Sequence, residues 1–539
     1  MATPGDWMYM IVDIILEKIE ILKYQSDGVS RTCLMTVADT LAEYFGFEEH
    51  DTDLRTEVIA GLTTFLTMSY VVVVAPGILS AAISVEGYDG GQVAQMLAIV
   101  TIVAAATATL VMALYANRPF AQAPGIGLMA FFAFTVVLAM GVPWQAALAA
   151  VFVEGIVFVA LTAVGAREYV VELFPKPVKF AVGAGIGAFL AIIGLQQMRV
   201  VAGDPETFVT FNPIFAGDPI AVLSVLGLLF TLLLYVRGVR GSIIAGIVAT
   251  GAAGYALDAA GVTAPQPNPE DAGFTLLDVS LTPDPVQPFY DVTPLVGAFL
   301  DGFEMVDPFT FALIVFTFFF VDFFDTAGTL TGVSQIADFL DEEGNLPEMD
   351  RPLMADAVGT TVGGMLGTST VTTYIESSTG VEEGGRTGMT ALVVALLFLA
   401  ALVAVPLAAA IPLYASHIAL VVVAIIMLRN VVDIAWDDVT HAVPAGLTIL
   451  VMPFTFSIAY GIAAGIVSYP VAKAANGEWR DVRAGQWVLA ALFVGYFAVR
   501  TDVPARWHTP PGKMTLHRGE GSRQGRRVDG DRHFCRGRD

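Results

Sequence analysis

The sequence predicts an all-α, polytopic membrane protein with about fourteen spans, arranged as two inverted repeats of about seven spans each. Composition is the first reason. The 539 residues are 55% hydrophobic and 14% charged, with a mean hydropathy of +0.69, whereas soluble domains have about 25% charged residues. Many apolar runs reach the ~20 residues that cross a bilayer. A polar, interrupted segment also stands at a matching place in each half of the chain.

The predicted spans follow one another closely. In the first half they are Val58–Ser84, Val93–Ala116, Pro124–Met140, Trp144–Val164, Val178–Met198, Ile220–Val236 and Ser242–Val262. A segment rich in Pro and Asp, residues 263–307, separates the halves. In the second half they are Pro308–Leu330, Leu353–Leu366, Gly367–Gly380, Thr390–Ile411, Ile418–Val432 and an apolar group over Val443–Ala475 and Gln486–Val499. We expect Gly461 and Gly465 to split this last group into short helices.

The basic residues predict the orientation, because cytoplasmic loops carry most Lys and Arg. With the N-terminus inside, essentially only Arg199 falls on the outer side, and residues 263–307, which lack Lys and Arg, form an extracytoplasmic loop. The residues on the cytoplasmic side are Arg55, Arg118, Arg167, Lys176, Lys179, Arg237, Arg240, Arg351, Arg386, Arg429 and Lys473. We therefore expect a multi-pass protein of the cell membrane with both termini in the cytoplasm.

The two ends of the chain differ from the apolar middle. Residues 1–54 are expected to form an N-terminal cytoplasmic segment. Within it, Val12–Tyr24 is expected as a short amphipathic helix, and residues 1–34 as an upstream extension of a start at Met35. Residues 501–539 form a basic tail that we expect to be disordered. The net charge of −24 argues against nucleic acid as a partner. The two cysteines and six histidines show no ligand spacing, so we expect no metal site and no cofactor.

The two interrupted segments are Gln122–Phe132 in the first half and Gly367–Gly380 in the second. Non-helical backbone at membrane depth is tolerated only where it is buried in protein or lines a cavity. Short extended segments are therefore expected in the third and tenth spans. Paired interruptions at corresponding positions are typical of transporters that bind their substrate near the middle of the membrane.

Acidic residues inside the spans are the candidates for substrate binding, because a carboxylate in the membrane is costly unless it faces a partner or a cavity. Asp322 and Asp325 are three residues apart, so they lie roughly on one face of the eighth span. Glu376 lies in the tenth span, near the expected start of a helix. The alternative for each is a purely structural role, in capping or bracing helices.

Two ionised carboxylates are hydrogen-bond acceptors, which suits a flat ligand with several N–H donors and disfavours an anion. Phe131, Phe132, Phe323 and Phe324 are candidates for aromatic faces that stack on such a ligand, although any one of them also fits simple packing.

Several motifs resemble those of the AzgA-like purine permeases, in the nucleobase:cation symporter and nucleobase–ascorbate transporter superfamily. They are EVIAGLTTFLTMSY at Glu57–Tyr70, APGIGL at Ala123–Leu128, DTAGTL at Asp325–Leu330, GTSTVTTYIES at Gly367–Ser377 and EGGRTG at Glu383–Gly388. The similarity covers about residues 41–499. It implies uptake of adenine, guanine or hypoxanthine together with a proton, by movement of a core domain against a gate domain.

The resemblance also implies a division of the chain. The core would comprise residues 55–166 and 308–411, and the gate residues 167–262 and 412–500. Asp325 and Glu376 would bind the base and carry the coupling proton. The other residues expected at the binding site are Phe131, Phe132, Thr326, Thr329, Ser377 and Met129. Met129 departs from the pattern of this family, whose members commonly have a polar Asn at this position. Relatives are often homodimers, but nothing in the sequence identifies a dimer surface.

Five alternatives stay open at this point, one of which is a receptor that does not transport. A uracil or xanthine permease of the same fold is the nearest, and sodium instead of the proton is the second. An anion exchanger of the related sulfate-type fold would need a basic or neutral site. An intramembrane aspartyl protease also places acids on separate spans, but its Gly-x-Gly-Asp pattern is absent.

Overall fold

The computed structural model describes residues 39–165, 174–204, 208–267, 276–283, 287–340 and 346–502. The expected upstream extension (residues 1–34), the expected helix Val12–Tyr24 and the tail from residue 503 onward lie outside the described residues. Among the described residues, the end of helix α22 from Leu492 onward belongs to a unit separate from the rest.

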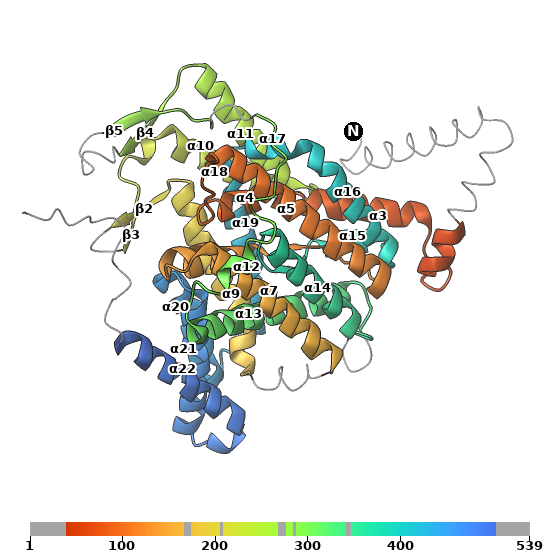
Figure 1. Cartoon of the computed structure of the whole chain (residues 1–539), viewed down its shortest axis with the longest axis vertical. Helices are drawn as coiled ribbons and strands as arrows, with labels where there is room; N and C mark the ends of the chain where they lie inside the picture. The colour runs from red at the N-terminus through yellow and green to blue at the C-terminus, as the bar shows by residue number, and fades with distance from the viewer. Residues whose placement is uncertain are drawn as a thin grey trace, which may run out of the picture. The chain divides into compact units, whose positions relative to one another are not determined.

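Helices dominate the first half of the chain (Figure 1). They are α3 (Leu54–Met68), α4 (Val71–Leu79), α5 (Gly90–Val111), η1 (Met112–Ala116), α6 (Ile126–Ala130), η2 (Phe131–Ala139), α7 (Trp144–Ala163), α9 (Lys176–Gln197), η3 (Phe215–Gly217), α10 (Pro219–Val236) and α11 (Ser242–Ala259). The first predicted span is thus two helices, which meet at Ser69 and Tyr70.

The second half of the chain is also mostly helical. Its helices are α12 (Phe299–Gly302), α13 (Pro308–Ile336), α14 (Asp350–Leu366), α15 (Ser377–Glu382), α16 (Gly388–Ala401), η4 (Leu402–Ala404), α17 (Val405–Ala409), α18 (Leu413–Ser416), α19 (Ile418–Met427), η5 (Leu428–Asp433), α20 (Val439–Thr455), α21 (Ile458–Ala475), η6 (Trp479–Asp481) and α22 (Ala484–Asp502).

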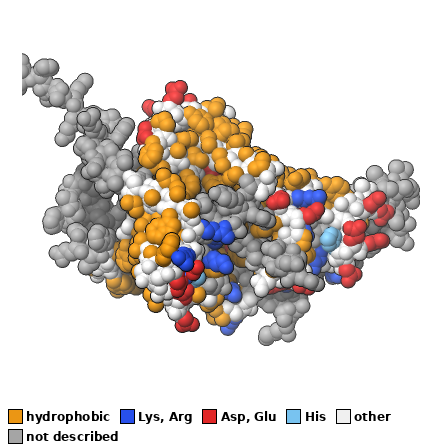
Figure 2. Space-filling model, turned by 90° about the horizontal axis from the view of Figure 1, so that it is seen from below, with side chains coloured by type: hydrophobic (Ala, Val, Ile, Leu, Met, Phe, Trp, Pro, Cys, Tyr) orange, Lys and Arg blue, Asp and Glu red, His pale blue; other side chains and the backbone are white. Residues whose placement is uncertain are grey.

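Nine helical stretches among the described residues are long and apolar enough to cross a membrane. Four shorter apolar helices accompany them: Ile126–Ala139, Leu413–Met427, Val439–Thr455 and Ala484–Gly495. Leucines of α10 such as Leu226 and Leu229 are exposed, as expected on a face that meets lipid. Figure 2 shows hydrophobic side chains over much of one face, around smaller groups of charged ones. The exact number of spans and the inverted repeat stay predictions.

Acidic N-caps start several of these helices. Asp53 accepts a hydrogen bond from the backbone N–H of Thr56 at the start of α3. Asp89 forms a capping box with Gln92 at the start of α5. Asp307 accepts from two backbone N–H groups at the start of α13. Each cap satisfies donors that the first turn of a helix leaves unpaired, which fixes where these apolar helices begin.

Glycines allow the long helices to pack closely. A Cβ at Gly155 of α7 would lie 2.6 Å from the backbone N of Thr361 in α14, so this contact requires glycine. The prediction that Gly461 and Gly465 split the last apolar group is wrong. Both lie inside α21, where an added Cβ would meet Met452 and Thr448 of α20, so they serve helix packing. The break comes instead at Phe456, whose φ of 52° ends α20.

The helices pack in two groups. Helix α16 packs on α3 and α5, while α14 packs on α5 and α7 (Figure 1). In the other group α9 packs on α19, α20 and α21, and α10 packs on α11. These groups resemble the expected core and gate in their membership, and that division stays a prediction.

The described residues form three two-stranded antiparallel sheets. Extended segments were expected in the third and tenth spans, and the structure has β1 (Gln122–Pro124) and β6 (Val371–Thr373) there. Two further hairpins were not expected: β2 (Val201–Asp204) with β3 (Phe208–Phe211), and β4 (Ala264–Pro267) with β5 (Leu276–Val279). They lie in the connections after α9 and α11, where no apolar periodicity marks them.

Strands β1 and β6 pair with each other although they lie in opposite halves of the chain. Gln122 faces Thr373, and Pro124 faces Val371. A two-stranded sheet has two open edges, and a threonine from a neighbouring helix closes each one. Thr109 of α5 accepts from the backbone N of Gln122 at 3.0 Å and donates to its carbonyl at 2.9 Å. Thr360 of α14 does the same for Val371, at 3.1 and 2.9 Å.

Replacing Thr109 by Val tests this edge closure. The variant keeps the shape of the side chain but leaves a buried N–H and a buried C=O of Gln122 without a partner, which costs about 1–3 kcal/mol for each group. We expect a clearly lower midpoint of thermal unfolding for the detergent-purified protein. Thr107→Val is the matched control, because Thr107 lies on the same helix and bonds only its own helix carbonyl, at Val103. Equal midpoints for the two variants would contradict the edge-closing role.

Candidate functional site

The site is built where β1 and β6 lead into two short helices. Beyond the strand pairs, the backbone N of Gly125 donates to the carbonyl of Thr370 at 3.0 Å, and that of Tyr374 donates to the carbonyl of Ala121 at 3.0 Å. Helix α6 follows β1, and α15 follows β6. Because the strands are antiparallel, the two helices leave the sheet at opposite ends.

Glu376 is held at the N-cap of α15. The helix begins at Ser377, slightly later than the expected start near Tyr374, because a tight turn over Tyr374–Glu376 comes first. The Tyr70 hydroxyl, at the break between α3 and α4, donates to Oε1 of Glu376 at 2.7 Å. The Glu376 side chain is only partly buried, so it has acceptor capacity left for a ligand.

Asp325 lies on α13 and is also partly exposed. Its carboxyl makes no hydrogen bond to another residue of the described part of the chain. Tyr374, which anchors the end of β1 by donating to the carbonyl of Pro124 at 2.6 Å, interacts electrostatically with both Asp325 and Glu376. Both acids therefore lie near a residue that is itself part of the strand crossing.

Two of the hydroxyl residues predicted at the binding site form hydrogen bonds within the protein. Thr326 is fully buried and donates to Oδ2 of Asp356 at 2.8 Å, while its hydroxyl also contacts that of Thr372 in β6 at 2.8 Å. Ser377 is buried and accepts from the backbone N of Ala121 at 2.9 Å. Thr329, one turn after Asp325, is partly exposed. Their roles in binding stay predictions.

The predicted apolar residues of the site are all buried. Met129 and Phe132 have no exposed surface, and Phe131 is 1% exposed. Phe131 packs edge-on against Phe318 of α13, with ring centroids 4.8 Å apart. Phe131 and Phe132 both pack against Phe318, so η2 and α13 share an aromatic contact beside the strand crossing. Whether these residues contact a ligand stays a prediction.

Sequence reasoning missed four polar residues of this region: Tyr70, Gln122, Glu154 and Asp356. Gln122 donates from Nε2 to Asp356 and to Thr373, at 3.2 Å each. Glu154 and Asp356 sit inside predicted spans, so the rule that singled out Asp325 applied to them equally. Nothing in the sequence marks Tyr70, because its contact with Glu376 joins residues 306 positions apart.

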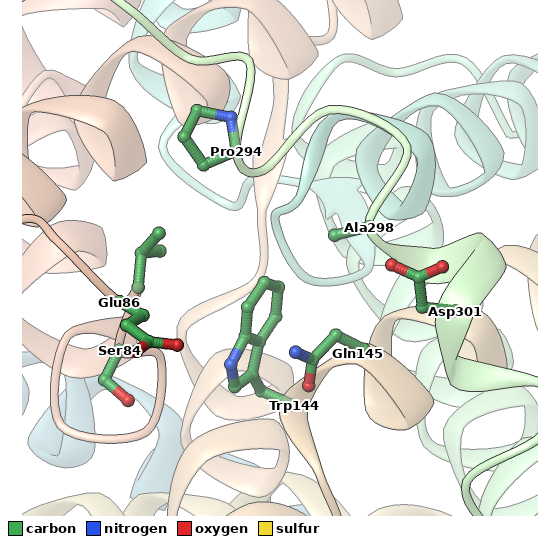
Figure 3. Close-up of a pocket in the computed structure, with 8 residues that line it drawn as sticks. Ser84, Glu86, Trp144, Gln145, Pro294, Ala298 and Asp301 are labelled. Atoms are coloured by element: carbon green, nitrogen blue, oxygen red, sulfur yellow. The ribbon is translucent and has the colours of Figure 1, made fainter.

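A cavity of ≈ 490 Å³ lies elsewhere. It is lined by Ser84, Val85, Glu86, Trp144, Gln145, Pro294, Ala298 and Asp301. Figure 3 shows Trp144 and Gln145 between Glu86 on one side and Asp301 on the other. The cavity contains none of the residues predicted to bind substrate. Among the described residues, no three His, Cys, Asp or Glu side chains come together so as to hold a metal ion.

The fold matches a solved transporter structure. The transmembrane domain of a cyanobacterial bicarbonate transporter, BicA, superposes with a TM-score of 0.53 at 14% sequence identity, covering 77% of this chain and 97% of that one. At this identity the match shows the fold alone. Together with the long apolar helices, it defines the class as an integral, multi-pass membrane protein.

The family follows from the sequence. The chain matches the permease family of the xanthine/uracil type over residues 55–464 and belongs to it. It is 38% identical over 454 residues to the adenine permease AdeP of Escherichia coli, covering 84% of this chain and 95% of that one. It is 39% identical over 459 residues to the guanine/hypoxanthine permease PbuG of Bacillus subtilis, with 84% and 98% covered. The resemblance noted from the motifs is thus confirmed, and the relatives are permeases rather than enzymes.

Proposed function

We propose that this protein imports purine nucleobases, namely adenine, guanine or hypoxanthine, into the cell together with a proton. The observation that carries the proposal is the pair of acids, Asp325 and Glu376, that both interact electrostatically with Tyr374 at the crossing of β1 and β6. Both are partly exposed, whereas the other acids at the crossing, Asp322 and Asp356, are fully buried. Partly exposed acids with free acceptor capacity are the ones that can meet a substrate.

The chemistry of the pair fits a neutral, planar base. Ionised carboxylates accept hydrogen bonds, and purine bases carry ring N–H groups, with an amino group as well in adenine and guanine, that donate in the plane of the ring. An anion would meet two negative charges there, so an anion exchanger is disfavoured despite the likeness in fold to a bicarbonate transporter. The adenine and guanine/hypoxanthine permeases among the relatives support a purine rather than a pyrimidine.

The transport cycle we propose is a movement of the core (residues 55–166 and 308–411) against the gate (residues 167–262 and 412–500). A base enters from outside and binds at the strand crossing, where Asp325 and Glu376 accept its N–H groups. One acid takes a proton with the base, which lowers the cost of moving negative charge through the low-dielectric interior. The core then shifts and opens the site to the cytoplasm, where both termini lie.

Glu376→Gln tests the binding role. The variant replaces one acceptor oxygen by an N–H₂ donor and removes the charge. Losing a charged hydrogen bond costs about 1.5–3 kcal/mol, a roughly tenfold to hundredfold loss of base affinity. We expect no accumulation of radiolabelled hypoxanthine or adenine in a host that lacks its own purine transporters.

The control is Glu382→Gln, an exposed acid on the same helix, which should transport like the unaltered protein. Near-normal accumulation by Glu376→Gln, with the protein present in the membrane, would remove this acid from the mechanism.

Met129 stands at the position where the resemblance to the AzgA-like permeases implies Asn. Met129→Asn supplies a polar group beside the crossing, and one added hydrogen bond is worth about 1 kcal/mol. We expect severalfold tighter binding of one purine and a changed order among adenine, guanine and hypoxanthine in competition uptake. Met129→Leu, which keeps the apolar character, should leave that order unchanged. If the Asn and Leu variants rank the three bases identically, Met129 has no part in selectivity.

The alternatives within the family differ in their substrates. Competition by unlabelled uracil or xanthine against labelled hypoxanthine separates a pyrimidine or xanthine carrier from the proposed purine carrier. Varying pH and sodium separately in the uptake buffer separates proton coupling from sodium coupling.

A further inference from the structure

Behind the proposed substrate site lies a second group of acids. Glu154 of α7, Asp322 of α13 and Asp356 of α14 come from three different helices, and each has 0% of its surface exposed. Asp322 precedes Asp325 by less than one helical turn. The charged groups that act on these three carboxyls are acids as well, namely one another and Asp325.

This buried acid cluster has more hydrogen-bond acceptors than donors. The carboxylate of Asp356 accepts hydrogen bonds from Nε2 of Gln122 at 3.2 Å and from the hydroxyl of Thr326 at 2.8 Å. Within the described part of the chain, neither oxygen of Glu154 accepts a hydrogen bond, and neither does Oδ1 of Asp322. Helices α7 and α13 nevertheless pack against each other, and the Glu154 and Asp322 carboxyls that they carry interact with each other. Two carboxylates in contact can bond only if a proton lies between them.

The buried acid cluster is better arranged to hold a proton than a metal ion. Among the described residues no three acidic, His or Cys side chains are arranged to hold a metal. Two unpaired anions in a low-dielectric interior repel each other and lose their hydration, whereas one shared proton removes a charge and makes a strong hydrogen bond.

Thr360 connects the buried acid cluster to strand β6 by hydrogen bonds. Its single hydroxyl hydrogen has two acceptors: the carbonyl of Val371 in β6 at 2.9 Å, and Oδ2 of Asp322 at 3.4 Å. With a proton between Glu154 and Asp322, Thr360 donates to Val371 and closes the edge of β6. Departure of that proton would make the Asp322 carboxylate the stronger acceptor, so that Thr360 would turn to it and the edge of β6 would lose a bond.

From this geometry we infer that Glu154 and Asp322 hold the coupling proton between them during transport and signal its presence to β6 through Thr360. Asp325, which is partly exposed and acts on both Asp322 and Asp356, is the group that passes the proton between the substrate site and the cluster. The inference rests on the proposed function, because it names where the proton of the proposed symport is held.

The first test measures coupling separately from translocation, with the purified protein in proteoliposomes. At an outside pH one unit below the inside, one proton per base supports roughly tenfold accumulation of labelled hypoxanthine. Glu154→Gln can donate an N–H to Asp322 and so mimics the protonated pair permanently. We expect this variant to lose the pH-driven accumulation and its pH profile, while exchange of labelled for unlabelled hypoxanthine continues. Ser334→Ala, which removes a buried unpaired hydroxyl elsewhere on α13, should keep both activities.

The second test needs no substrate. The infrared spectrum of the unaltered protein should contain the carbonyl band of a protonated, buried carboxylic acid at neutral pH. That band should be lost in Glu154→Gln and also in Asp322→Asn, so a folding defect in one variant leaves the other to decide.

The outcomes separate the two claims. An unaltered protein that neither binds nor exchanges any purine refutes the proposed function, while the infrared band still reports on the shared proton. Unchanged pH-driven accumulation by Glu154→Gln overturns the inference and leaves purine transport standing. Absence of the band in the unaltered protein overturns it as well. A band that disappears in the variants without any change in coupling shows a purely structural proton, which also overturns it.

Discussion

The structure depends on one constraint: extended backbone inside a membrane protein must have all its hydrogen bonds satisfied within the protein. Strands β1 and β6 satisfy half of theirs by pairing with each other across the two halves of the chain. Thr109 and Thr360 close the two remaining edges, each by bonding both the N–H and the C=O of one strand residue. The two threonines precede their strand partners by 13 and 11 residues, which is the similarity of placement that an inverted repeat would give.

The proposed site follows from this closed crossing. Because the strands are fixed, Tyr374 can anchor the end of β1 and place Glu376 at the N-cap of α15. The Tyr70 hydroxyl then orients the Glu376 carboxylate from the break between α3 and α4. Thr326 ties α13, and with it the neighbouring Asp325, to β6 through Thr372. A displacement of β6 would therefore reach both acids, as the proposed coupling of substrate to proton requires.

Much of this architecture could be predicted from the sequence, because apolar runs and polar interruptions are local signals. The apolar helices and the extended segments at Gln122 and Val371 come from such signals, while the roles of Asp325 and Glu376 stay predictions. The contacts that organise the site could not be predicted, because they join distant positions: Tyr70 with Glu376, or Gln122 with Asp356. Gly461 and Gly465 were misjudged for the same reason, since the residues that they pack against lie on another helix.

The central claim is that a planar base binds between Asp325 and Glu376 at the strand crossing. The most direct measurement is a structure determined with hypoxanthine bound. The account predicts the base at the ends of β1 and β6, with its N–H groups within hydrogen-bonding distance of both carboxylates. A base lodged only in the cavity beside Trp144 and Asp301, with neither Asp325 nor Glu376 in contact with it, would contradict the account.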